Sequence, residues 1–238
     1  MDRGSRAARS LIGSASMGTC LAGCAARRLG PCSLADVIAR HIAPLNALVD
    51  LLRDEQAGRW VPYVAPMYGG VDARVLSELR DPGPNTNADH GGSGFLCWET
   101  TTRLQSGSLP CSRASASRPA TWCPGTPNPW YINKSPTAAQ LKAGVAPMAV
   151  LSALLPILRV VMLHGGSAKN IWTRLTRRYP RLEEDRGLTV IATYHTSRQA
   201  FWHPDPSERM RRAAHLTEAF KQASDVLRSF GVNSGRVT

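Results

Sequence analysis

The chain has 238 residues, a formal net charge of +12 and a hydrophobic content of 43%. This length suffices for one well-buried α/β domain and leaves too little for a second full domain. The charge favours a polyanionic partner such as nucleic acid. Residues 1–33 carry +4 and residues 100–127 carry +3, so the rest of the chain is only mildly basic at +5.

Residues 1–33 are rich in Arg, Ser, Ala and Gly and show no apolar periodicity. This composition is typical of a disordered or spurious extension. Leu21 to Cys24 resembles a lipoprotein processing site, but the preceding apolar region is interrupted by Ser and Thr. We therefore expect a single domain over residues 34–238, no export, no membrane association and a cytoplasmic protein.

Helical patterns predict three long helices. The first follows Ser33 as a cap and ends near Gly58, and the second spans residues 137–157 with an interruption at Pro147. The third begins at Asp205 and Pro206 and ends at Gly231. The apolar face of the first helix is predicted to comprise Ile38, Ile42, Leu45, Leu48 and Leu52. That of the third is predicted to comprise Met210, Ala214, Leu216, Phe220, Ala223 and Leu227.

Three apolar runs predict buried strands, at residues 74–80, 158–163 and 188–194. The second run is hydrophobic almost throughout, which indicates a central parallel strand with helices on both faces. Two of the runs end in chemically active side chains, Asp81 and His195. Ligands of open α/β sheets bind at the carboxyl ends of strands, so both are candidate site residues. The alternatives are a turn carboxylate and a satisfied strand-end histidine.

Asp81-Pro82-Gly83, Gly94-Phe95 and His195-Thr196-Ser197 together resemble the motifs of the uracil-DNA glycosylase superfamily, in a bacterial or phage branch. The resemblance covers about residues 34–230, apart from residues 100–127. It implies a three-layer α/β/α sandwich around a short, mostly parallel central sheet. It also implies a DNA repair enzyme of base excision repair that acts as a monomer, without a cofactor, on uracil-containing DNA.

The resemblance assigns a role to each motif residue. It implies that Asp81 orients the water and stabilises the sugar cation, that His195 donates to uracil O2, and that Phe95 stacks on the base. Two residues depart from the pattern of the family. Gly83 stands where some members carry a Tyr that excludes thymine, and Thr196 stands where Pro is usual. The substrate-binding set that the resemblance implies is Pro82, Gly83, Phe95 and Asn128, with Tyr63 and Tyr68 as pocket walls or ordinary loop anchors.

Several residues are candidates for contact with DNA. Ser197 would hold a phosphate, and Arg198, Gln199 or Phe201 would fill the gap that the flipped nucleotide leaves in the stack. Arginines at near-helical spacing either line the DNA backbone or form a solvated basic face. These arginines are Arg174, Arg177, Arg178 and Arg181.

Residues 100–127 show neither helical nor strand periodicity, although the implied fold needs a helix and a strand there. A shifted reading frame, with one nucleotide deleted and one inserted, would explain this loss while keeping the length. Asn128 is then the nearest asparagine for reading uracil, at a position expected to lie outside any strand. The alternative to a glycosylase is a non-catalytic nucleic-acid-binding protein or an inactive frameshifted homologue.

The six cysteines do not predict a metal centre. Three lie within residues 1–33 and two within residues 100–127, which leaves Cys97 alone in the rest of the chain. This spacing argues against an iron-sulfur cluster, a zinc site or a disulfide framework. We therefore expect no metal.

Overall fold

The structure is a computed structural model that describes residues 37–54, 56–87, 91–96, 119–132 and 134–231. A four-stranded parallel sheet organises these residues, with the strand order β4-β2-β5-β6. A second, two-stranded parallel sheet pairs β1 with β3. The strands are β1 (Tyr63–Val64), β2 (Val75–Glu78), β3 (Phe95–Leu96), β4 (Trp122–Gly125), β5 (Val160–His164) and β6 (Thr189–Thr193).

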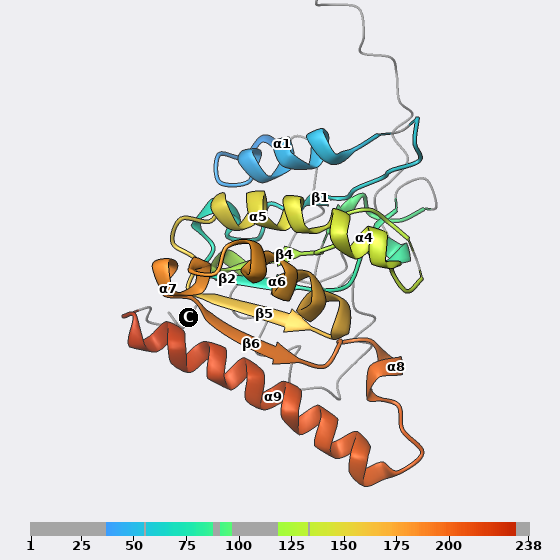
Figure 1. The fold of residues 1–238 in the computed structure, drawn as a ribbon, viewed down its shortest axis with the longest axis vertical. Helices are drawn as coiled ribbons and strands as arrows, with labels where there is room; N and C mark the ends of the chain where they lie inside the picture. The colour runs from blue at the N-terminus through green and yellow to red at the C-terminus, as the bar shows by residue number, and fades with distance from the viewer. Residues whose placement is uncertain (1–36, 55, 88–90, 97–118, 133, 232–238) are drawn as a thin grey trace, which may run out of the picture.

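Helices cover both faces of the four-stranded sheet (Figure 1). Helix α9 packs against β5 and β6 on one face, while α6 packs against β5 and carries α4 and α5 on the other, with α1 beyond α5. This arrangement confirms the predicted three-layer α/β/α fold class. The helices are α1 (Ala43–Leu52), α4 (Ala138–Ala143), α5 (Val145–Ala153), α6 (Gly166–Arg178), α7 (Leu182–Arg186), α8 (Arg198–Phe201) and α9 (Pro206–Ser229), with 3-10 turns η2 (Gly70–Asp72), η3 (Pro84–Thr86) and η5 (Pro119–Thr121).

The two inner strands, β2 and β5, form the centre of the core. All four residues of β2 and all five of β5 are buried, because helices cover both faces of the sheet. Val75 pairs with Trp122 on one side and with Val160 on the other, so the three strands are in register. Their carboxyl ends therefore lie at one edge, on the right in Figure 1.

Helix α1 is shorter than predicted at both ends. It begins at Ala43, directly before Pro44, and ends at Leu52. Proline lacks a backbone N–H and fits the first turn of a helix, so it favours a helix start at this point. Ile38, predicted on the apolar face, is 79% exposed. Ser33, its predicted cap, lies outside the described residues.

The predicted helix over residues 137–157 is divided at a different residue. Thr137 caps α4 by accepting from the Gln140 backbone N–H, and the break before α5 falls at Gly144, not at Pro147. Pro147 lies in the first turn of α5, where its missing N–H leaves no intrahelical bond unmade. The prediction of an interruption at Pro147 was therefore wrong by three residues.

Helix α9 begins as predicted, with Pro206 in its first turn and the Asp205 carboxylate accepting from the Ser207 backbone N–H at 2.9 Å. Its first turns lie beside α8, beyond the end of β6 (Figure 1). Met210 is consequently 68% exposed and Ala214 is also exposed, which corrects their assignment to the core. The buried face consists of Leu216, Ala219, Phe220, Ala223 and Leu227.

Strand β4 lies within the segment that was expected to contain no strand. All four of its residues are buried, and it pairs with β2 along its whole length. Its Pro124 removes one ladder donor, which is tolerated in a strand that has a single described neighbour. The expectation of a missing strand was therefore wrong. Residues 97–118, to which most of the shifted-frame hypothesis applies, lie outside the described residues.

Within the described part of the chain, no helix combines the length and the apolar character that crossing a bilayer requires.

Candidate functional site at the carboxyl edge of the sheet

Three of the predicted site residues follow strands that end at the same edge of the sheet. Asp81 follows β2, Asn128 follows β4 and His195 follows β6. The loops after β2 and β4 are joined, because the Asn128 backbone N–H donates to the Arg80 carbonyl at 3.4 Å. The sheet therefore brings a carboxylate, an amide and an imidazole to one edge.

Asp81 is only 5% exposed, and its carboxylate is paired with the residue before it. The Arg80 Nε donates to Asp81 Oδ1, and the Arg80 side chain is 37% exposed. The turn that follows is well ordered by hydrogen bonds, since the Gly83 carbonyl accepts from the Thr86 backbone N–H at 2.9 Å. Pro82 is buried in this turn. Asp81 thus lies in a fixed turn and beside a cation.

His195 is held in one tautomer by its own loop. Its Nδ1 accepts the Ser197 backbone N–H at 3.1 Å, so a neutral ring carries its proton on Nε2. Burial lowers the pKa of His195, and the positive charge of Arg80 lowers it further, while Asp81 opposes the shift. The arrangement favours a neutral imidazole that donates through Nε2.

The β5 end supports His195 from behind. Gly165 has a φ of +86°, and a Cβ at this position would lie 3.1 Å from the His195 Cβ. The Gly165 N–H also donates to the Thr193 carbonyl at 2.9 Å. Gly165 therefore allows the β5 end to pack closely against His195, whereas a Cβ at Gly166 would meet no atom within 4 Å.

A buried Ser–His pair, which the sequence did not single out, lies under the site. Ser77 Oγ and His164 Nε2 are 3.0 Å apart, and both side chains are at most 1% exposed. Burial lowers the pKa of His164 to about 3, helped by the charge of His195 and opposed by a backbone hydrogen bond with Tyr194. The sequence does contain a signal for this pair, because Ser77 is a polar residue within an apolar run and His164 directly follows one.

Asn128 has an unused acceptor. The residue is fully buried, and its Nδ2 donates to the Trp130 carbonyl at 3.0 Å. Its Oδ1 has no hydrogen-bond partner among the described residues. Trp130 is fixed in turn, because its Nε1 donates to the Leu52 carbonyl at the end of α1 at 2.9 Å. A buried acceptor without a partner is uncommon, and this oxygen is available to accept a hydrogen bond.

Thr196, the residue after His195, is 2% exposed. Its Oγ1 also has no hydrogen-bond partner among the described residues. The loop after β6 therefore carries a second buried polar atom without a partner. Nothing in the structure explains this hydroxyl.

Phe95 lies in the small β1–β3 sheet, where it is 3% exposed and 6.5 Å from the Tyr63 ring centroid. Tyr63 contacts the end of α1. Its hydroxyl donates to Asp50 at 2.7 Å, and the guanidinium of Arg53, the residue after the helix, lies 3.8 Å from its ring centroid. These contacts favour the anchor interpretation for Tyr63. Tyr68 is 7% exposed and belongs to the hydrophobic core.

Some of the predicted DNA contacts lie next to His195. Ser197 precedes α8, and its Oγ accepts from the Ala200 N–H at 3.4 Å. Gln199 is exposed on α8, whereas Phe201 is half-buried against the core. The side chain of Arg198 lies outside the described residues. Sequence reasoning did not select Trp202, although this adjacent aromatic is 66% exposed.

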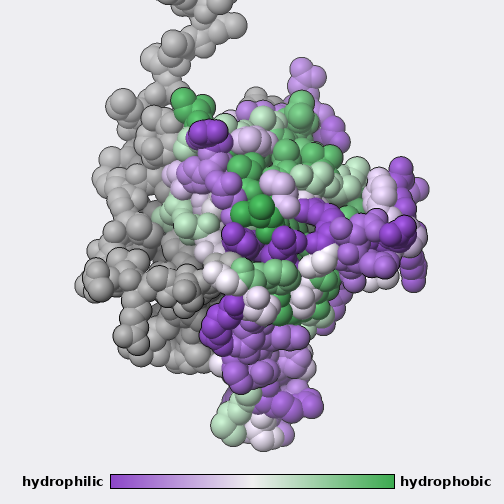
Figure 2. Space-filling model, turned by 90° about the vertical axis from the view of Figure 1, so that its left-hand side faces the viewer, coloured by the Kyte–Doolittle hydropathy of each residue, from purple (hydrophilic) through white to green (hydrophobic). Residues whose placement is uncertain are grey.

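The arginines of α6 are not brought together with the site. The helix starts at the carboxyl end of β5 and runs back across the sheet, so Arg177 lies about 16 Å along it from Gly166. Arg177 and Arg178 therefore lie toward the amino edge of the sheet, where hydrophilic residues gather on the surface shown in Figure 2. Arg174 is engaged locally, with its Nε donating to Asn170 at 2.7 Å. The DNA contact expected of these arginines stays a prediction, because this separation leaves both the DNA-backbone role and the solvated basic face open.

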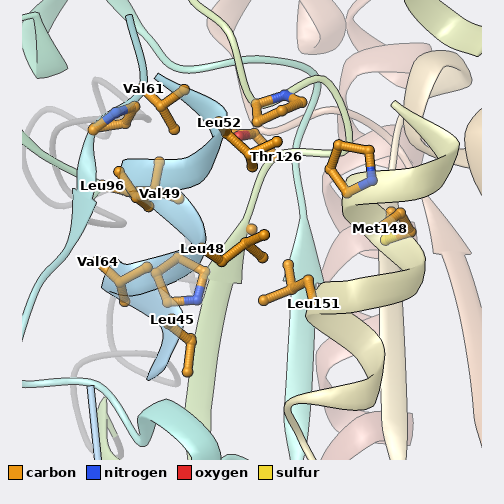
Figure 3. A pocket seen from close by; sticks show the side chains of 15 residues that line it. Leu45, Leu48, Val49, Leu52, Val61, Val64, Leu96, Thr126, Met148 and Leu151 are labelled. Atoms are coloured by element: carbon orange, nitrogen blue, oxygen red, sulfur yellow. The ribbon is translucent and has the colours of Figure 1, made fainter. Parts of the chain in front are cut away.

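A cavity of about 50 Å³ lies between α1, α5 and the ends of β3 and β4 (Figure 3). Its walls are almost wholly apolar, with Leu48, Met148 and Leu151 among them. It contains neither Asp81 nor His195, so this cavity is not the place where the polar groups converge. It reaches Thr126 and Pro129, which flank Asn128 in the chain.

A buried carboxylate, that of Glu78, lies at the end of β2. Glu78 is fully buried, and neither carboxylate oxygen has a hydrogen-bond partner among the described residues. Burial raises its pKa to about 8, so the carboxyl group is mainly protonated at neutral pH. Its neighbour Cys123 is also buried, and burial together with the charge of Glu78 raises the pKa of that thiol.

The described residues contain no group of three or more His, Cys, Asp or Glu side chains that could hold a metal ion. Of the six cysteines, Cys123 is the one that the structure describes. No protein-family model matches the chain, and a search of curated proteins also finds no match.

Proposed function

We propose that this protein is a uracil-DNA glycosylase, which flips uracil out of DNA and hydrolyses its N-glycosidic bond. The observation that carries the proposal is the convergence of Asp81, Asn128 and His195 at one sheet edge, with Asn128 Oδ1 buried and without a partner among the described residues. The motif resemblance supports the same function.

Asn128 supplies base recognition in this proposal. Its unused Oδ1 accepts the N3–H of uracil, and the second hydrogen of Nδ2 is available for O4, since the first is donated to Trp130. Cytosine has no hydrogen on N3 and would place two acceptors against each other. A buried acceptor left unpaired costs about 1–3 kcal/mol, which gives selectivity for uracil.

His195 and Asp81 carry the chemistry. As the N-glycosidic bond breaks, negative charge develops on uracil O2, and the Nε2–H of neutral His195 donates to it. The Asp81 carboxylate stabilises the positive charge on the sugar and orients the water that adds to C1′. Uracil leaves as an anion with the electron pair of the broken bond. The proton that the water loses as it forms the new C–O bond ends on this anion, so neutral uracil is released.

The experiment is release of uracil from a labelled single- or double-stranded oligonucleotide. We expect release by the intact chain and a loss on the order of 10²-fold or more in Asp81→Asn, His195→Ala and Asn128→Ala, with DNA binding retained. Matched controls are Asp54→Asn and His203→Ala, whose side chains make local hydrogen bonds with Arg59 and with the Asp205 N–H and have no role in the proposal. DNA binding by the intact chain without any release would favour a non-catalytic nucleic-acid-binding protein.

A further inference from the structure

The Arg80 guanidinium is a cation within the candidate site to which no role has yet been given. It binds Asp81 through Nε, while its side chain remains 37% exposed and that of Asp81 only 2% exposed. The Arg80 carbonyl accepts from the Asn128 N–H, so the same residue also joins the loop after β4. Arg80 thus contacts two of the three converging loops.

We propose that Arg80 is a positioning residue of the site: it fixes the Asp81 carboxylate and places a permanent positive charge beside His195. The inference rests on the proposed glycosylase function. An ion pair between a buried carboxylate and an arginine limits the orientations of the carboxylate. A positive charge beside the leaving base also favours the anion that forms there, an effect that solvent partly screens because the Arg80 side chain is 37% exposed.

The groups that face His195 come from several elements. Arg80 and Asp81 lie at the end of β2, and their charges shift the pKa of His195. His164 lies at the end of β5, and the charge of His195 lowers its pKa. On the α9 side, the His215 ring lies 5.2 Å from that of Tyr194, the residue before His195, and Arg212 lies over the same ring. Among these groups, Arg80 is the cation that lowers the pKa of His195.

The sign of the pH effect follows from this arrangement. Catalysis requires neutral His195, so activity falls as the pH drops through the pKa of His195. Removing the Arg80 charge removes a cause that lowers this pKa, and the pKa therefore rises. In Arg80→Gln, kcat is expected to fall at a higher pH on the acidic side of its pH profile than in the unmodified chain. In Arg80→Lys the positive charge remains, so kcat should fall at about the same pH as in the unmodified chain.

The test compares Arg80→Gln and Arg80→Lys with the unmodified chain in uracil release and in an NMR titration of His195. We expect kcat to fall about a hundredfold in Arg80→Gln with a smaller change in KM, and the His195 titration to move to higher pH. Arg80→Lys should restore the titration and part of kcat. Arg59→Gln is the matched control, since Arg59 pairs with the more exposed Asp54.

Unchanged kcat and an unchanged His195 titration in folded Arg80→Gln would overturn the inference. If the unmodified chain releases no uracil, the proposed function fails, and the NMR titration alone decides whether Arg80 sets the charge state of His195. If Arg80→Gln does not fold, the double variant Arg80→Gln/Asp81→Asn removes both charges of the pair. It is then compared with Asp81→Asn, and an equal His195 titration in the two would contradict the inference.

Discussion

At the scale of single residues, Glu78 has a large expected effect on stability. Its carboxylate is fully buried without a hydrogen-bond partner among the described residues, and burial raises its pKa from 4.5 to about 8. The folded protein therefore binds a proton that the unfolded chain releases between these two pH values. This contribution to stability is present below pH 4.5 and is lost as the pH rises toward 8.

We predict that Glu78→Gln removes this pH dependence. Across the window from 4.5 to about 8, Glu78 lowers the free energy of unfolding by about 1.4 kcal/mol for each pH unit. The variant should lose that slope and become more stable relative to the unmodified chain as the pH rises. Urea denaturation at several pH values measures the effect, with the exposed Glu218→Gln as control. Equal slopes in both proteins would contradict the assignment.

Individual site residues differed in how far the sequence could predict them. Asp81 and His195 were visible because each interrupts an apolar run at its end, and such ends meet at one edge in a parallel sheet. Glu78 lies within one predicted buried run and His164 follows another, but their partners and pKa values depend on elements distant in the chain. Whether Asn128 has a partner is likewise fixed by its neighbours in space, Trp130 and Arg80.

At the scale of elements, β4 depends on a close approach between two strands. Gly125 pairs with Glu78, and a Cβ at Gly125 would lie 2.3 Å from Glu78 Oε1. Both residues are buried, so the carboxylate cannot move into solvent. The absence of a side chain at Gly125 therefore allows β4 to lie against β2 while Glu78 points into the protein.

We expect Gly125→Ala to lower the free energy of unfolding by about 1–3 kcal/mol, the usual cost of overpacking a core. The cost should be smaller when Glu78→Ala is present, since the clashing carboxylate is then gone. Chemical denaturation of the two single variants and the double variant measures this coupling. Gly166→Ala is the control because a Cβ there meets nothing within 4 Å, and additive effects in the double variant would show that the clash is not the cause.

Elements with a strong local pattern were predicted, and those defined by pairing were not. Strands β2, β5 and β6 correspond to apolar runs, which a buried parallel sheet requires. Strand β4 has the sequence Trp-Cys-Pro-Gly and shows no strand pattern, since its place depends on hydrogen bonds with β2. The extent of α1 was also misjudged, because apolar spacing continues before its start at Ile38 and Ile42 and no strong stop residue precedes Gly58.

At the scale of the whole molecule, two buried groups give opposite dependences of stability on pH. The pKa of His164 is about 3 in the folded protein and 6.5 as the ordinary value, so the unfolded chain binds the extra proton between these values. His164 therefore makes stability rise with pH from about 3 to 6.5, and Glu78 makes it fall from 4.5 to about 8.

The contributions of His164 and Glu78 together should rise between about pH 3 and 4.5, remain nearly level to 6.5, and fall toward 8. The lowered pKa of His195 adds to the rise below pH 6.5 and leaves the fall above it unchanged. His164→Gln should remove the rise, whereas Glu78→Gln should remove the fall. The carboxylates of Asp54, Asp205 and Glu208 also have lowered pKa values, but their ion pairs and hydrogen bonds are exposed and should contribute little. Thermal or urea unfolding of the full chain across this range checks the shape, and a curve that only rises from pH 3 to 8 would contradict the assignment to Glu78.

The apolar cavity beneath α1 has a consequence for small organic solutes. It opens to solvent, and its walls offer few polar partners to the water in its space of about 50 Å³. A small apolar solute should displace this water more readily than a polar solute of the same size, because few hydrogen bonds are lost. The layer between α1 and α5 is therefore the part of the fold where such solutes should bind first, while the close-packed strands β2 and β5 exclude them.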